Sequence, residues 1–140
     1  MSEIAQAYKW AVATMKGDSA LTTAATGGVW QGFADIGTAG PYALVARQGG
    51  QDALTLAVVR IFSHISLQIK AVGPANNYAA LVTIAGRIDA LFKRTGPAAL
   101  PDGGGVIACW REQEVAYSEL VNGAQWEHLG GLYHLELQGA

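Results

Sequence analysis

The three histidines, His64, His128 and His134, are the side chains with the widest chemical use in this chain. His134 and Glu136 lie two apart in an alternating segment, so both point to one face of an expected strand. His64 begins another such segment on its polar side. Imidazoles can hold zinc, but no short ligand spacing supports a zinc site here. We therefore expect solvent-facing sheet histidines and no bound metal.

Glu112 and Glu114 are also two apart and are expected on one strand face. Neither a nucleophile motif nor a water site accompanies them, which favours a solvated or inter-subunit face over acid–base chemistry. Cys109 is the only cysteine, so an internal disulfide is excluded, and its apolar surroundings favour a buried core residue over a nucleophile.

The glycine run Asp102-Gly103-Gly104-Gly105 invites a phosphate-loop interpretation. We reject it because no lysine and Ser/Thr follow at the required spacing, and because the glycines lead into a strand. Nucleophile-elbow and dinucleotide fingerprints are absent too. The four tryptophans have no interleaved basic residues, so they favour core or interface anchoring over base stacking. We expect no catalytic residue and no cofactor.

Charged residues make up 14% of the chain, against about 25% in an ordinary soluble domain. This deficit has two explanations: a surface partly covered by other subunits, or a genome that favours Ala and Gly. Composition alone does not favour one explanation over the other. The formal net charge of −2 argues against a general nucleic-acid surface. No apolar run reaches the roughly 18 residues of a membrane span, and the acidic start with Lys9 and Lys16 indicates no signal peptide.

The elements that must position these side chains begin with the segment His64–Val72, which alternates polar and apolar residues. Its period of two predicts a strand with one buried face, formed by Ile65, Leu67, Ile69 and Ala71. Gly73-Pro74 ends the strand, and a helix follows over Tyr78–Arg94, capped by Asn76 or Asn77 and with Lys93 and Arg94 in its last turn. Its apolar stripe is predicted to pack on the strand. The stripe comprises Tyr78, Leu81, Val82, Ala85, Ile88, Leu91 and Phe92.

The remaining segments predict a single domain over residues 1–140. We expect a first helix over Ser2–Met15 and a shorter helix over Ser19–Ala25, capped by Asp18 or Ser19. Strands are expected within Val29–Ile36, Tyr42–Arg47, Val106–Leu120 and Trp126–Gln138, with loops at Gln48–Asp52 and Thr95–Gly105. Leu54–Ile61 is expected to be strand, and its apolar density fits either an extension that runs into Ile65–Val72 or a separate short element. A bulge or turn is expected near Arg111–Gln113, and a tight hairpin at Asn122-Gly123. This order predicts an α+β fold: one mainly antiparallel or mixed sheet of four to five strands packed against two main helices.

This layout resembles the tail terminator (tail completion) proteins of long-tailed phages and phage-like particles. The resemblance spans nearly the whole chain. It is carried by the N-terminal helix, the Val29-Trp30 piece, the Pro41-Tyr42 strand opening, the strand His64–Val72, the helix Asn77–Arg94 and the closing run Gly131-Leu132-Tyr133-His134-Leu135-Glu136-Leu137. The long Gly/Pro loop Gly96–Gly105 and the low charge depart from the family pattern.

The resemblance implies a non-enzymatic virion protein that forms a ring, typically a hexamer. It caps the tail tube, stops polymerisation and offers a head-joining surface at the head-proximal end, after assembly in the host cytoplasm. Its partners would be its own copies, the tail tube protein and a head-completion or connector protein. No membrane and no sequence-specific nucleic acid are implied, although DNA could pass through the lumen. Candidate lumen or interface residues are Gln68, Lys70, Trp110, Glu112 and Glu114.

Two other functions stay open from the sequence. One is a head–tail joining (neck) protein, which shares the size and the ring assembly. The other is a small ligand-binding or catalytic α+β domain with a pocket lined by Trp30, Tyr42, Trp110 and Tyr133. The lack of a convergent acid, base or nucleophile counts against this last class.

Overall fold

The computed structural model describes residues 3–35, 37–54, 60–93, 98–100 and 104–138. Its centre is one six-stranded mixed sheet in the order β1-β2-β3-β6-β5-β4, in which only β1 and β2 run parallel. The strands are β1 (Val29–Gln31), β2 (Tyr42–Leu54), β3 (Arg60–Pro74), β4 (Ala98–Ala99), β5 (Gly105–Val121) and β6 (Ala124–Gln138). The expected α+β fold is confirmed, and β1 lies within the strand expected over Val29–Ile36. The additional strand is the two-residue β4, which lies inside the expected loop over 95–105.

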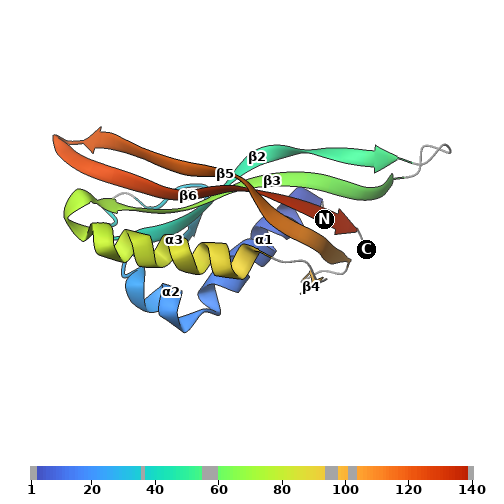
Figure 1. Ribbon diagram of the computed structural model, residues 1–140, viewed down its shortest axis with the longest axis horizontal. Helices are drawn as coiled ribbons and strands as arrows, with labels where there is room; N and C mark the ends of the chain where they lie inside the picture. Colours follow the sequence, from blue (N-terminus) through green and yellow to red (C-terminus); the bar gives the residue numbers. More distant parts are fainter. Residues whose placement is uncertain (1–2, 36, 55–59, 94–97, 101–103, 139–140) are drawn as a thin grey trace.

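Three helices lie on one face of this sheet: α1 (Glu3–Lys16), α2 (Ser19–Ala24) and α3 (Tyr78–Phe92) (Figure 1). The predicted alternation of β3 is confirmed, because Ile65, Leu67, Ile69 and Ala71 are all buried beneath the helices. On α3 the buried residues are Leu81, Ile84, Ile88 and Phe92. Tyr78 and Val82 were expected on this stripe but are half exposed, and Ile84 is buried instead.

The short helix α2 is fixed by Asp18, as predicted. One carboxylate oxygen of Asp18 accepts hydrogen bonds from the backbone N–H groups of Ala20 (3.0 Å) and Leu21 (3.1 Å). The other oxygen accepts from the Nε of Arg87 on α3 at 3.0 Å. The hydrogen bonds from Arg87 hold the pKa of the Asp18 carboxyl below its usual value. One side chain therefore caps α2 and ties it to α3.

The predicted loop at Gln48–Asp52 is wrong. Strand β2 continues through these residues to Leu54 and pairs with β3, with a register shift between Arg47 and Gly49. Glycine backbones make ladder hydrogen bonds as well as any other residue, so pairing with a long neighbour overrides the loop-like composition. The expected strand over 54–61 is described only at Leu54 and from Arg60 onward, and residues 55–59 lie outside the described residues.

Both ends of α3 also differ from the prediction. A 3₁₀ turn, η1 (Ala75–Asn77), leads into the helix, and Asn77 makes no side-chain cap. The helix ends at Phe92, so Lys93 follows its last turn, and Arg94 is not among the described residues. In the expected loop over 95–105, Ala98 and Ala99 pair as β4 with Val106 and Gly105.

The long hairpin of β5 and β6 closes at Asn122-Gly123, as predicted. Both residues have positive φ, 51° and 80°, as a two-residue type I′ turn requires. The three strands β3, β5 and β6 have 15 to 17 residues and so span about 50–56 Å, whereas α3 spans about 22 Å. The strands are therefore about twice as long as α3 and extend past it, most clearly toward the right of Figure 1. No described helix has the length and apolarity to cross a membrane.

Candidate functional site

The face of the sheet opposite the helices, called here the outer face, carries most of the polar side chains singled out above. Along β3 the residues that alternate with the buried ones point to this face, among them His64, Gln68 and Lys70. The neighbouring strand β6 adds His128, His134 and Glu136. The outer face therefore gathers charged and aromatic groups from β3, β5 and β6.

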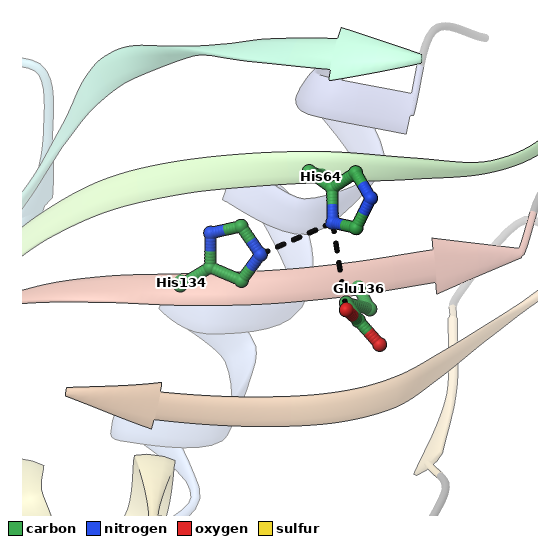
Figure 2. Close-up of side chains that lie close together, drawn as sticks. All are labelled: His64, His134 and Glu136. Atoms are coloured by element: carbon green, nitrogen blue, oxygen red, sulfur yellow. Dashed lines mark hydrogen bonds and ion pairs between the residues drawn. The ribbon is translucent and has the colours of Figure 1, made fainter. Parts of the chain in front are cut away.

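The first group on this face is the histidine cluster, made of His64, His134 and Glu136. His64 Nδ1 lies 3.2 Å from His134 Nε2 and 3.5 Å from a carboxylate oxygen of Glu136. Figure 2 shows the three side chains pointing toward one another from β3 and β6. The strand register brings the three residues together: His64 on β3 lies opposite Glu136 on β6, and His134 precedes Glu136 by two residues on the same strand. One candidate ligand atom from each residue lies within 4.8 Å of the others.

Strand β5 adds two residues to this cluster. Glu112 places a carboxylate oxygen 3.1 Å from the other ring nitrogen of His134, Nδ1. The indole of Trp110 lies against the same imidazole, with 4.5 Å between ring centroids. His134 is thereby held on both ring nitrogens and on one ring face, and its side chain is only 15% exposed.

Glu112 and Glu114 do not share a strand face, contrary to prediction. The register of β5 shifts between Arg111 and Gln113, at the bulge expected there. Glu112 keeps the face of Trp110 and points to His134 on the outer face, and the residue added by the bulge inverts the alternation after it. Glu114 instead lines a hollow with Arg111 and the α3 residues Asp89 and Tyr78 on the helical side.

The second outer-face group is the lysine cluster, made of Lys70, Tyr117, Glu119 and His128. The ammonium of Lys70 donates to the Tyr117 hydroxyl at 2.6 Å, and the Tyr117 ring stacks on His128 with 4.2 Å between centroids. His128 Nε2 lies 2.6 Å from a carboxylate oxygen of Glu119. The expectation of a solvent-facing histidine is wrong for His128, which is buried under Tyr117.

Burial lowers the pKa of the His128 imidazole below its ordinary value, and the hydrogen bond to Glu119 opposes this shift only in part. Desolvation disfavours the protonated ring, and the nearby positive charge of Lys70 acts in the same direction. Lys70 itself is almost fully buried although it lies on the outer face. Of the candidate interface residues, Trp110, Glu112 and Glu114 are exposed and Gln68 is intermediate.

The aromatic pocket weighed as an alternative does not assemble. Tyr133 is buried on the helical side, where its hydroxyl donates to Asp89 at 3.2 Å, whereas Trp110 lies on the outer face against His134. Tyr42 contacts Trp126 instead, in a hollow of about 400 Å³ that also includes Glu119. Trp30 donates its indole N–H to the Gly27 carbonyl.

Strand β5 also presents an apolar rim, of which sequence reasoning named only Trp110 as a candidate interface residue. Its exposed large side chains are Ile107, Trp110, Tyr117, Leu120 and Val121, and Leu120 is 78% exposed. Beyond Val106, no described strand pairs with the outer edge of β5. Alternation in the sequence placed these residues in a strand but could not show that the strand lies near the edge of the sheet.

No protein-family model and no curated protein sequence matches this chain. Among solved structures, the chain resembles one from the virion of a native gene transfer agent (GTA) particle. The two superpose with a TM-score of 0.75 over 99% of this chain and 100% of the other, at 15% sequence identity. At this identity the likeness shows a shared fold over the full length of both chains.

Proposed function

We propose that this protein is a structural component of a phage or phage-like virion, and more specifically a tail terminator. In this role it assembles as a ring, typically of six copies, on the finished tail tube, ends polymerisation and offers a surface to the head. The observation that carries the proposal is the full-length fold match to a chain of a gene transfer agent virion. The role is structural rather than enzymatic, and its partners are other virion proteins.

The free edge of β5 supports assembly with further copies. An unpaired edge strand offers backbone N–H and C=O groups to another chain, and soluble monomers usually protect such edges. Here the edge carries the exposed side chains of Ile107, Leu120 and Val121. Apolar and aromatic residues of this kind form the centre of protein–protein interfaces. A ring of head-to-tail contacts would cover this edge in every subunit, in keeping with the low charge fraction of the chain.

The test is a polymerisation assay with purified tail tube protein from the same particle. Added protein should stop tube growth at substoichiometric ratios, because one ring closes one tube end. Leu120→Lys should abolish the effect, whereas Val82→Lys, an equal charge change at a half-exposed position on α3, should leave it intact. Growth unaffected by the protein, together with tight binding to emptied heads, would instead support the neck-protein alternative.

A further inference from the structure

The histidine cluster has the composition and spacing of a metal site. In a tetrahedral site with ligand atoms about 2.0–2.1 Å from the ion, neighbouring ligand atoms are about 3.3 Å apart. The spacing from His64 Nδ1 to His134 Nε2 is 3.2 Å and that from His64 Nδ1 to the Glu136 carboxylate is 3.5 Å, on either side of this value. The third spacing, between the Glu136 carboxylate and His134 Nε2, lies within 4.8 Å, and the Glu136 side chain is 28% exposed.

The surroundings of His134 favour metal binding through Nε2. A carboxylate accepts only from a ring nitrogen that carries hydrogen, so Glu112 at Nδ1 selects the tautomer with a lone pair on Nε2. This nitrogen faces His64 Nδ1 at 3.2 Å (Figure 2), and the ligand atoms of His64, His134 and Glu136 all lie within 4.8 Å of one another. Metal-binding histidines in proteins almost always donate their other N–H in this way. Trp110 adds an apolar wall on one side of the imidazole.

We propose that His64 Nδ1, His134 Nε2 and a carboxylate oxygen of Glu136 bind one divalent first-row transition metal ion, with Zn²⁺ as the best fit. Two imidazoles and one carboxylate are ligands that Zn²⁺ accepts, whereas Mg²⁺ and Ca²⁺ prefer oxygen ligands alone. Glu112 is a positioning residue that holds the His134 ring. The fourth position of the tetrahedron is open to water or to a donor atom from another chain.

The test is equilibrium dialysis of the tag-free protein against ZnCl₂ at neutral pH, followed by elemental analysis. One Zn²⁺ per chain is expected. His64→Gln and His134→Gln should each remove stoichiometric binding, whereas His128→Gln, the third histidine, should leave it unchanged. Glu112→Gln should weaken the affinity about 10–100-fold, as loss of a carboxylate behind a histidine ligand does. Glu114→Gln, on the same strand but the opposite face, is its matched control.

Circular dichroism of each variant shows whether it folds. Should a histidine variant unfold, Glu136→Gln and Glu112→Gln carry the test, because both side chains are partly exposed. Co²⁺ provides an independent readout: it should give the strong visible absorption of a four-coordinate ion and quench tryptophan fluorescence, a response that Trp110→Phe largely removes. Substoichiometric Zn²⁺, or binding that survives in both histidine variants, would show a cluster joined by hydrogen bonds alone. The assay needs no tail tube, so its outcome is independent of the proposed virion role.

Discussion

At the scale of single residues, the outer face holds two histidines in opposite situations. His134 has a carboxylate on one ring nitrogen and an imidazole on the other. His128 is buried between Tyr117 and the sheet, and its Nδ1 has no hydrogen-bond partner among the described residues. The first arrangement suits an ion, whereas the second disfavours a positive charge on the ring.

Burial of His128 predicts a pH dependence of stability. Its folded-state pKa is lowered from the ordinary 6.5, so below about pH 6.5 the unfolded chain binds a proton there that the folded chain does not. Stability should therefore fall as pH falls through this range. The groups facing the His128 ring are Glu119, Glu127, Lys70 and Tyr117.

Urea midpoints at a series of pH values from 7.5 to 5 measure the effect, and the midpoint of His128→Gln should fall less than that of the wild type. Equal falls in the two proteins would contradict the assignment of the pH dependence to His128.

Replacing glycine by alanine should have opposite effects on stability at two positions where no neighbouring atom would contact the added methyl group. Gly123 in the hairpin turn has φ +80°, so Gly123→Ala should lower stability by about 1–2 kcal/mol through backbone strain. Gly86 lies inside α3 with open space around it, so Gly86→Ala should raise stability by about 0.5–1 kcal/mol. Denaturant unfolding of both variants checks the signs, and a shift in the same direction for both would refute this explanation.

At the scale of elements, the strand–helix packing predicted from alternation is the part of the fold that follows most directly from sequence. Leu67→Ala on β3 and Ile88→Ala on α3 should each cost about 2–5 kcal/mol, because both side chains are fully buried in one core. Val82→Ala, at a half-exposed position on the same helix, should cost much less. Unchanged urea midpoints for Leu67→Ala and Ile88→Ala would contradict the packing of α3 on β3.

What sequence reasoning missed depends on pairing between distant segments. Gln48–Asp52 looks like a loop locally and becomes strand only because β3 is long enough to pair with it. Glu112 and Glu114 separate because a bulge falls between Arg111 and Gln113, and the sequence located that bulge without revealing its effect on the faces.

The histidine cluster shows the same limit. Ligand spacing along the chain gives no sign of a zinc site, because the candidate ligands meet across the β3–β6 register. His64 and His134 are 70 residues apart in the sequence. The expectation of no bound metal stays a prediction from sequence, and the geometry of the histidine cluster is the basis for proposing a metal site instead. Residue types alone singled out the three histidines, and only the strand register shows that His64 and His134 lie together.

At the scale of the whole molecule, helices cover one face of the sheet and leave the outer face and the β5 edge to other contacts (Figure 1). If subunits join through this edge, Leu120→Lys should prevent assembly without unfolding the monomer, since Leu120 is 78% exposed. Native mass spectrometry in the presence of tail tubes, with circular dichroism as a folding check, measures both effects. Ring formation by Leu120→Lys as efficient as in the wild type would place the contact elsewhere.

The most direct test of the tail-terminator proposal is electron cryomicroscopy of tail tube ends after addition of the purified protein. The proposal predicts one closed ring of copies, six in number, at a single end of each tube, with the outer sheet face or the β5 edge in subunit contacts. Free protein can remain monomeric in this experiment, because the tube end is the template for the ring. Tube ends that stay bare, on tubes that continue to lengthen in an excess of folded protein, would contradict the proposal.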